Sequence, residues 1–348
     1  MRRETRVPRP TIADVARQAQ VSKSTVSRVL NGQTSAMRAT THERVEQAIA
    51  DLGYRPSALA RSLTLGRSRT IGLLISDVGN PFYAEVIQGV EDLALSEGYS
   101  LFTANTRYDL LRAERLIASL ADHEVDGVIV MSSMLSERCV ALLRQRGIPA
   151  VVIDWPCQVE IGRVGAVRVD YASGIDQAIE HLVSMGHRVV GHLSGPAHLP
   201  TSQTRTTAFL EAMAARGLDA QSAPVVTGTL RMEGAGDALA SFLAHSPQPT
   251  AILAANDQSA LGLLFAAHGM GLSIPGDLSL IGLDDIRLAS QVSPSLTTIA
   301  LPRLHLGRMA TEMLLGLVQG QAAEPPIATV TTRLVVRSST APPMKETR

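Results

Sequence analysis

From Ile71 onward, apolar runs of strand length alternate with amphipathic stretches of helix length. The first series of runs reads TIGLLISD, YSLFTAN, DGVIVMSS and PAVVID, with helical patterns over 82–97, 111–123 and 137–146 between them. Short, continuous apolar runs separated by helices are typical of parallel strands that are buried on both faces. This part of the sequence therefore predicts a doubly wound parallel sheet.

A second series of the same kind follows. Its apolar runs are AVRVD, RVVGHLSG, TAILAAND and LSLIGLDD, and its helical patterns cover 173–185, 203–215, 235–244 and 258–268. Two series in one chain predict an α/β body with two doubly wound parallel sheets that face each other across a cleft. Ligands of such sheets bind outside the carboxyl ends of the strands, so the strand ends are where a site is expected.

The N-terminal segment has a different pattern, with three short amphipathic stretches. Thr11 and Ser22 stand before the first two stretches as N-cap candidates, and the third runs from residue 41 to residue 52, before Gly53. Apolar residues recur with helical spacing at Ile12, Val15, Ala16 and Ala19, and again at Val26, Val29 and Leu30. Two short helices with one small core between them predict a helix-turn-helix.

Charge separates this segment from the rest of the chain. The net charge is zero, yet residues 1–69 carry 13 Lys and Arg against 5 Asp and Glu, which leaves the remainder acidic. The second helix has donors on its free face, namely Lys23, Ser24, Ser27 and Arg28. Arg can bridge guanine O6 and N7 in the major groove, and Ser can donate to phosphates, so the segment predicts a contact with DNA. The alternative is an ordinary amphipathic helix pair with a solvated basic surface.

Several other classes of protein are not indicated. No apolar run reaches the roughly 18 residues of a membrane span, and the start lacks the apolar region of a secretory signal. Two cysteines are expected to be reduced thiols, which favours a cytoplasmic protein. No metal-ligand spacing, nucleophile elbow or phosphate-binding loop occurs in the sequence, so we expect neither an enzyme nor a cofactor.

The stretch TIADVARQAQVSKSTVSRVLNG, with ERVEQAIADLGYRPSALARSLTLGRSRTIGLLI after it, resembles the lactose-repressor (LacI/GalR) family of bacterial transcription factors. The resemblance extends to TRLVVRSS near the C-terminus. It implies an all-α helix-turn-helix DNA-binding domain over 1–54, a hinge helix and linker over 55–69, and a two-lobed periplasmic-binding-protein-like α/β domain over 70–348. One departure is the loop in QTSAMRATTHERV, which is a residue longer than usual and lacks the family's aromatic.

The resemblance also implies roles for residues in the DNA-binding part. Lys23, Ser24 and Arg28 match the base-reading positions, and phosphate contacts are implied for Thr11, Ser22, Thr25, Ser27 and Asn31. In the hinge PSALARSL, Leu63 matches the residue that enters the minor groove, and Ala60 matches the close approach beside it. Eight residues are too few for a stable isolated helix, so the alternative is a simple linker.

Polar residues at the strand ends mark the expected ligand site. Carboxylate and amide groups follow several runs, and DVGNPFY adds aromatic rings that can stack on a sugar or a base. The family pattern narrows the candidates, of which Arg205 and Asp284 are expected to grip vicinal hydroxyls; Leu230 stands where the family often has a stacking aromatic. The full set is Asp77, Phe82, Tyr83, Asp154, Trp155, Asp170, Thr201, Arg205, Asn256 and Asp284.

The function that uses every part is a repressor whose affinity for a near-palindromic operator is controlled by a small molecule. The residue types favour a sugar or sugar acid, while the family also includes regulators that need a co-repressor such as a purine. A sugar-binding transport protein would share the two lobes but would have no use for the first 60 residues. The last eight residues, APPMKETR, are too short for a heptad zipper, so a homodimer is expected.

The hinge gives the first prediction. We expect Leu63→Ala to lower the affinity for a specific operator more than the affinity for unrelated DNA, because only the specific complex uses an apolar wedge. Titrations of both DNAs at one fixed salt concentration measure the difference. An equal loss for both would contradict a wedge.

Overall fold

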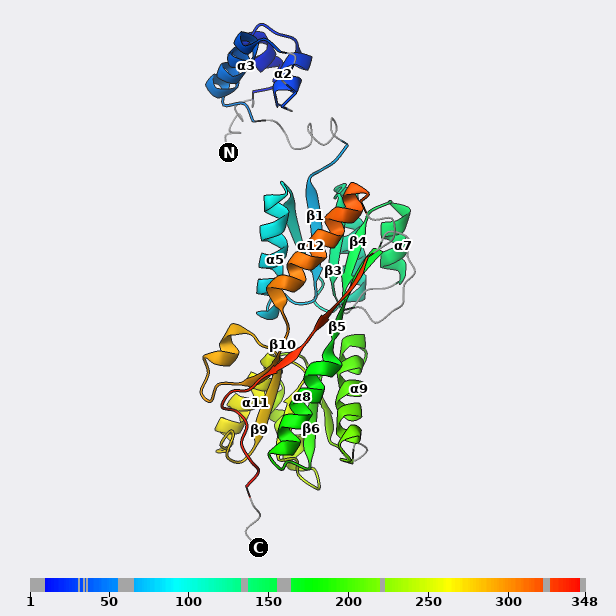
Figure 1. Cartoon of the computed structure of the whole chain (residues 1–348), viewed down its shortest axis with the longest axis vertical. Coiled ribbons are helices and arrows are strands. Elements are labelled where there is room, and N and C mark those ends of the chain that lie inside the picture. Colours follow the sequence, from blue (N-terminus) through cyan, green and yellow to red (C-terminus); the bar gives the residue numbers. More distant parts are fainter. Residues whose placement is uncertain are drawn as a thin grey trace, which may run out of the picture. The chain divides into compact units, whose positions relative to one another are not determined.

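The computed structural model describes residues 10–30, 32–33, 35, 37–55, 66–132, 137–154, 164–219, 223–321 and 326–344. The chain forms two compact units, Met1–Ser68 and Arg69–Arg348 (Figure 1). The first unit contains helices α1 (Ile12–Gln18), α2 (Lys23–Leu30) and α3 (Ala39–Leu52).

Local hydrogen bonds explain where these helices begin. The carboxylate of Asp14 accepts hydrogen bonds from the backbone N–H and the hydroxyl of Thr11, at 2.9 and 2.7 Å, before α1. Ser22 Oγ accepts from the backbone N–H of Thr25 at 3.1 Å and caps α2. Gly53 ends α3 in the left-handed conformation. The three helices enclose a small core of Val15, Ala16, Ala19, Val26, Val45 and Ala48.

The second unit consists of two lobes, each built on a six-stranded sheet. The first lobe has the strand order β11-β5-β4-β3-β1-β2, and the second has β12-β10-β9-β8-β6-β7. All neighbours are parallel except β10 and β12. The two doubly wound sheets predicted from the sequence are therefore confirmed.

The strands of the first lobe are β1 (Thr70–Ile75), β2 (Ser100–Asn105), β3 (Gly127–Met131), β4 (Ala150–Ile153), β5 (Val164–Asp170) and β11 (Ile327–Thr331). Those of the second are β6 (Val190–Ser194), β7 (Val225–Thr227), β8 (Ala251–Ala254), β9 (Ser279–Asp284), β10 (Thr297–Ala300) and β12 (Arg333–Val335). The assignment of AVRVD to the second series was wrong. This run lies in β5, which pairs with β4 and β11 of the first sheet, because the chain enters the second lobe only after Asp170.

Helices cover both sheets. In the first lobe these are α5 (Phe82–Ser96), α6 (Leu110–Asp122), α7 (Glu137–Gln145) and α12 (Arg303–Gln319). In the second they are α8 (Tyr171–Ser184), α9 (Pro200–Ala215), α10 (Ala235–Leu243), α11 (Asp257–Gly269) and the 3-10 helix η1 (Arg287–Ser290). Within the ranges that the structure describes, no helix is long and apolar enough to cross a membrane.

The chain passes between the lobes three times: between β5 and α8, between β10 and α12, and between β11 and β12. The first and third passages are tied together by Thr332. Its hydroxyl donates to the carbonyl of Asp170 at 2.7 Å and accepts from the backbone N–H of Gly174 at 3.0 Å. The strand ends of both lobes are thereby held around the crossing point.

Helices α5 and α12 lie side by side on the first lobe (Figure 1). Their contact depends on glycine, because a Cβ on Gly89 would lie 2.2 Å from the carbonyl oxygen of Leu304. A Cβ on Gly307 would lie 2.2 Å from the carbonyl oxygen of Val86. A backbone carbonyl cannot rotate away as a side chain can, so any larger residue would separate the helices.

This contact gives a second prediction. Gly89→Ala is expected to lower the free energy of unfolding by about 1–3 kcal/mol, as overpacking of an interior contact does. The matched control is Gly316→Ala in α12, where a Cβ would meet nothing within 4 Å. That variant should gain roughly 0.5–1 kcal/mol from the higher helix propensity of alanine. Urea unfolding measures the free energy of unfolding of both variants. Equal changes in the two variants would contradict a steric role for the contact at Gly89.

Candidate functional site

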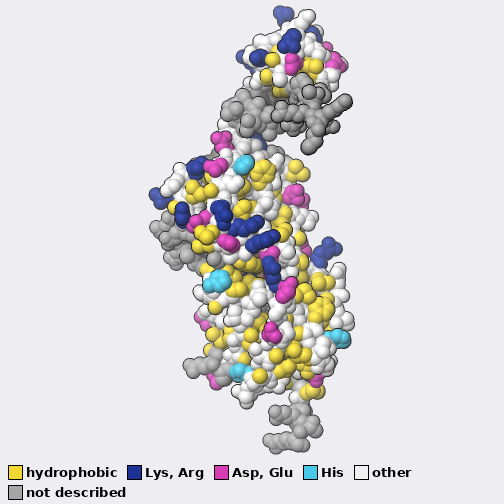
Figure 2. All heavy atoms as spheres, turned by 180° about the vertical axis from the view of Figure 1, so that it is seen from behind, with side chains coloured by type: hydrophobic (Ala, Val, Ile, Leu, Met, Phe, Trp, Pro, Cys, Tyr) yellow, Lys and Arg dark blue, Asp and Glu magenta, His cyan; other side chains and the backbone are white. Residues whose placement is uncertain are grey.

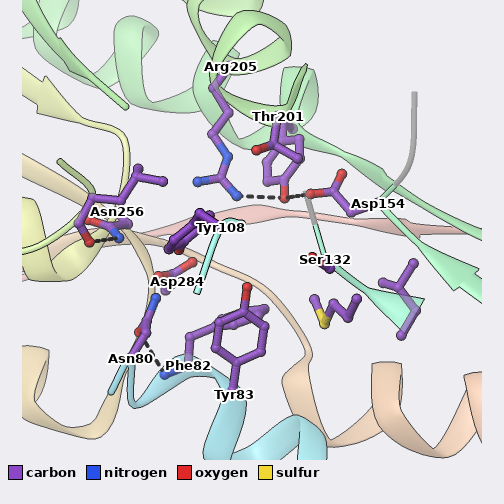
Figure 3. A pocket seen from close by; sticks show the side chains of 14 residues that line it. Asn80, Phe82, Tyr83, Tyr108, Ser132, Asp154, Thr201, Arg205, Asn256 and Asp284 are labelled. Carbon is purple, nitrogen blue, oxygen red and sulfur yellow. Dashed lines mark hydrogen bonds between the residues drawn. The ribbon is translucent and has the colours of Figure 1, made fainter. Parts of the chain in front are cut away.

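A pocket lies between the two lobes at the carboxyl ends of their strands (Figure 3). It holds about 480 Å³ of space, its opening to solvent included. The first lobe contributes Asn80, Phe82, Tyr83, Tyr108, Met131, Ser132, Ile153 and Asp154. The second contributes Tyr171, Thr201, Arg205, Leu230, Asn256 and Asp284. The position agrees with the rule for open parallel sheets, in which ligands bind beyond the carboxyl ends of the strands.

A chain of hydrogen bonds across the pocket joins the two lobes. Arg205 on α9 donates through Nη2 to the hydroxyl of Tyr171 at 2.8 Å, and this hydroxyl donates to Asp154 at the end of β4 at 2.6 Å. The guanidinium also lies over the Tyr171 ring, 4.4 Å from its centroid. Nη1 of Arg205 donates to the carbonyl of Ala255 at 2.8 Å. These contacts fix the direction of the guanidinium before any ligand binds.

Burial changes the charge state of the acidic groups in the pocket. It raises the pKa of Asp284 to about 8, although Arg205 nearby lowers it, and it raises the pKa of Asp154 to about 6. Burial also opposes the charge on Arg205, but Tyr171, Asp284 and Asp154 outweigh it and raise the pKa of this guanidinium. Near neutral pH the pocket therefore contains one positively charged side chain, Arg205. It also contains one protonated carboxyl, Asp284, which can both donate and accept a hydrogen bond.

Two amides shape the rest of the wall. Asn256 Oδ1 accepts from the backbone N–H of Ser259 at 2.8 Å, and its Nδ2 donates to the carbonyl of Leu230 at 2.8 Å. Asn80 Oδ1 accepts from the backbone N–H of Phe82 at 3.0 Å. Asn256 thus caps α11, and Asn80 accepts from the first residue of α5. Both helices begin at the pocket, where the helix dipole favours oxygen atoms of a ligand.

The structure brings together seven of the ten ligand-site candidates: Phe82, Tyr83, Asp154, Thr201, Arg205, Asn256 and Asp284. Asp77 and Asp170 are not among the residues that line the pocket. Asp77 pairs with Arg231 of the other lobe at 2.7 Å, and Asp170 caps α8 by accepting from the backbone N–H of Ser173 at 3.1 Å. Trp155 lies outside the described residues.

The sequence analysis missed two tyrosines of the pocket. Tyr108 follows β2 by three residues and is in contact with the apolar group of Leu199, Leu230 and Ala255 on the other lobe. Tyr171 begins α8 directly after Asp170. Both stand within three residues of a strand end that the sequence analysis had already singled out, so a wider search around each strand end would have found them.

In the first unit, the predicted base-reading residues Lys23, Ser24 and Arg28 are exposed on α2. Among the phosphate candidates, Thr11 and Ser22 are exposed and also serve as caps, whereas Thr25 and Ser27 are half-buried. Lys and Arg side chains lie on the surface of this unit (Figure 2). Asn31, Ala60 and Leu63 lie outside the described residues.

The fold and the two-lobed pocket define a class: a DNA-binding regulator with a helix-turn-helix and a ligand-binding body. Comparison with known proteins agrees. Residues 11–57 match the family described as "Bacterial regulatory proteins, lacI family", and residues 179–340 match "Periplasmic binding protein-like domain". The repressor PurR of Photobacterium profundum is 36% identical over 330 residues, which are 94% of this chain and 98% of that protein. Catabolite control protein A of Priestia megaterium is 32% identical over 95% of this chain and 99% of its own.

Solved structures give the same result. The lac repressor dimer bound to operator and the anti-inducer ONPF has a TM-score of 0.84 at 28% identity, covering 96% of this chain and 100% of that one. The complex of the transcriptional regulator CelR with cellobiose has a TM-score of 0.72 at 30% identity, covering 95% and 100%. The chain belongs to the lacI family of bacterial regulatory proteins, and it is a transcriptional repressor rather than an enzyme.

The buried acid gives a third prediction. The folded-state pKa of Asp284 lies above its ordinary value of 3.8, so the proton on this carboxyl stabilises the fold at low pH, and that stability is lost as pH rises from about 4 to about 8. We expect the melting temperature of the wild type to fall over this range and to level off above it. Asp284→Asn cannot ionise and should show a flatter profile, while Asp92→Asn, an exposed change on α5, should follow the wild type. A D284N profile as steep as that of the wild type would refute this.

Proposed function

We propose that this repressor is controlled by a small polyhydroxylated molecule, a sugar or a sugar acid, held between Arg205, Asp284 and the aromatic residues of the pocket. The observation that carries the proposal is that a guanidinium, Arg205, and a proton-holding carboxyl, Asp284, line the second-lobe side of the pocket, while Phe82 and Tyr83 line the first-lobe side. A sugar hydroxyl can donate a hydrogen bond and accept one at the same oxygen. The protonated carboxyl of Asp284 can likewise donate to it or accept from it. The DNA-binding roles given above for α2 are part of the same proposal.

A neutral sugar fits the pocket better than a sugar acid does. Two N–H groups of Arg205 are already donated within the protein, to Tyr171 and Ala255. The Nε–H of Arg205 has no partner within the described residues, and it can donate to a neutral ligand hydroxyl without breaking these bonds. The neighbouring acid Asp154, whose pKa is about 6, also opposes a further negative charge near neutral pH. Solved lacI-family relatives with cellobiose and with ribose support the same ligand class.

A purine co-repressor is the second candidate. Phe82, Tyr83, Tyr108 and Tyr171 all line the pocket, and aromatic faces suit a flat base as well as a sugar ring. PurR repressors are also 36% identical to the chain over at least 94% of its length, against 28–31% for the lac repressor, CelR and ribose-bound structures. Leu230, an aliphatic residue buried in the wall, leaves that side without a stacking ring.

The repressor is proposed to act as a homodimer on a near-palindromic operator, because one recognition helix reads only a few base pairs. Exposed hydrophobic side chains occur over the second unit (Figure 2). Phe102 on the edge strand β2 is 48% exposed, and Phe265 on α11 is 52% exposed. Aromatic residues are enriched at protein interfaces, so these two are proposed to lie in the dimer contact.

Control of DNA binding follows from where the ligand binds. A ligand that contacts both lobes favours one arrangement of the lobes over another. It can change operator affinity only by its differential affinity for these two arrangements. A screen of sugars, sugar acids and nucleobases by thermal shift, with each hit retested on operator DNA, identifies the ligand class. A hit that stabilises the protein and changes DNA affinity supports the proposal, and hits confined to nucleobases support the second candidate.

Arg205 gives the fourth prediction. Arg205→Ala is expected to remove the effector's influence on operator binding, while operator affinity without effector stays as in the wild type. Isothermal titration calorimetry measures the binding of the effector found in the screen. Arg216→Ala is the control, since Arg216 pairs with Asp176 and Glu180 and is not among the pocket residues. An unchanged effector response in the Arg205 variant would rule out this pocket.

A further inference from the structure

Strand β9 ends in an unusual backbone conformation. Asp284 has φ of 127° and Asp285 has φ of 58°, so two consecutive residues that carry a Cβ adopt the left-handed region. Side chains disfavour this region for steric reasons, and neither position holds the glycine that would relieve it. The turn therefore needs support from the surrounding structure. The question matters because this turn carries the buried carboxyl of the pocket.

Arg303, the first residue of α12, supplies contacts on both sides. Its Nη1 donates to the backbone carbonyls of both Asp284 and Asp285. Its Nη2 donates to the two carboxylate oxygens of Glu85, each at 3.0 Å, and its Nε donates to one of them at 3.2 Å. The side chain is only 9% exposed. The planar fork of the guanidinium is therefore fully used, with two carbonyls on one edge and one carboxylate on the other.

Further contacts hold the flanks of the turn within the second lobe. Asp257 accepts from the backbone N–H of Ile286 at 2.8 Å and from the hydroxyl of Thr298 at 2.5 Å. Arg337 pairs with the carboxylate of Asp285 at 2.5 Å. Asp257 thus holds the backbone of Ile286, the residue after the turn, and Arg337 holds only the side chain of Asp285. The contacts of Arg303 are with the two carbonyls of the left-handed residues themselves, and they continue to Glu85 on α5 of the first lobe.

We propose that Arg303 is a positioning residue for Asp284: it holds the left-handed turn that presents this carboxyl to the pocket, and Glu85 orients the guanidinium. Helix α5 begins with the pocket residues Phe82 and Tyr83, one turn before Glu85. The contact thereby ties the second-lobe wall of the pocket to the first-lobe wall. The inference rests on the proposed function only in taking Asp284 as a ligand-binding group.

An ordinary buried ion pair would have different consequences. If Arg303 and Glu85 served only to join α12 to α5, their loss would loosen these helices and leave the end of β9 as it is. A lysine keeps the charge but is a point donor that cannot bridge two carbonyls and a carboxylate at once. Arg303→Lys therefore separates the charge of this residue from its geometry.

Hydrogen exchange on the full chain tests the proposal without any effector. In Arg303→Met, amides of the segment 282–289 are expected to exchange at least tenfold faster than in the wild type. Arg303→Lys and Glu85→Gln should give smaller increases there, of a few fold, and they serve if the methionine variant does not fold. Arg216→Met removes another arginine with two acidic partners, and its exchange at 282–289 should match the wild type. Wild-type exchange at 282–289 in all the Arg303 variants overturns the proposal.

A pH profile adds a measure that a purely structural role would not change. Asp284 is faced by Arg205, Asp257, Arg303 and Asn80. The stability loss caused by its ionisation is assigned by comparison with Asp284→Asn in each background. The pH at which this loss ends is expected to move above about 8 in Arg303→Met, which lacks the positive charge, and to stay near 8 in Arg303→Lys. An unmoved end of the loss in Arg303→Met overturns the proposal. Neither measurement uses a ligand, so failure to find an effector would count against the proposed function alone.

Discussion

The hydrogen-bond chain from Arg205 through Tyr171 to Asp154 is the interaction on which the site depends. Tyr171 stands where the chain first enters the second lobe, so its hydroxyl is within reach of residues from both sheets. Because Tyr171 lies where the two lobes join, a rotation of the lobes displaces its hydroxyl little. The bond from Arg205 to this hydroxyl can therefore be kept when the lobes rotate. Binding at such a point lets a small molecule act on the arrangement of two large bodies.

Desolvation decides the chemistry of this pocket. Several acids converge on one arginine, and if all were charged the buried negative charge would be too costly. Asp284 instead keeps its proton into the neutral range, and Asp154 gives its acceptor capacity to Tyr171. The same acids that look like a highly charged cluster in the sequence thus form a nearly neutral, hydrogen-bonding surface. That surface suits an uncharged ligand better than an ionic one.

Much of this could be predicted from the sequence because the signals are local. The strand and helix periods indicated both sheets, and the shared edge of parallel strands indicated where the pocket lies. The family resemblance then narrowed the candidates, seven of which line the pocket, including Thr201 and Arg205 on α9. Asp77 and Asp170 have the same local pattern as Asp154 and Asp284. Asp170 differs from them by a local feature, because it caps α8 three residues before Ser173. Asp77 differs only by its ion pair with Arg231 of the other lobe, which no local pattern reveals.

The sequence by itself therefore determined the helix-turn-helix, the α/β body and the edge at which a ligand binds, since periodicity, caps and charge act over a few residues. Only the tertiary structure decided which lobe receives β5, which strand-end acids face the pocket, and how Arg303 supports the turn at Asp284. These depend on contacts between residues up to 218 positions apart, as between Glu85 and Arg303. Such contacts are set by how the three crossings bring the lobes together, and that geometry is a property of the folded chain.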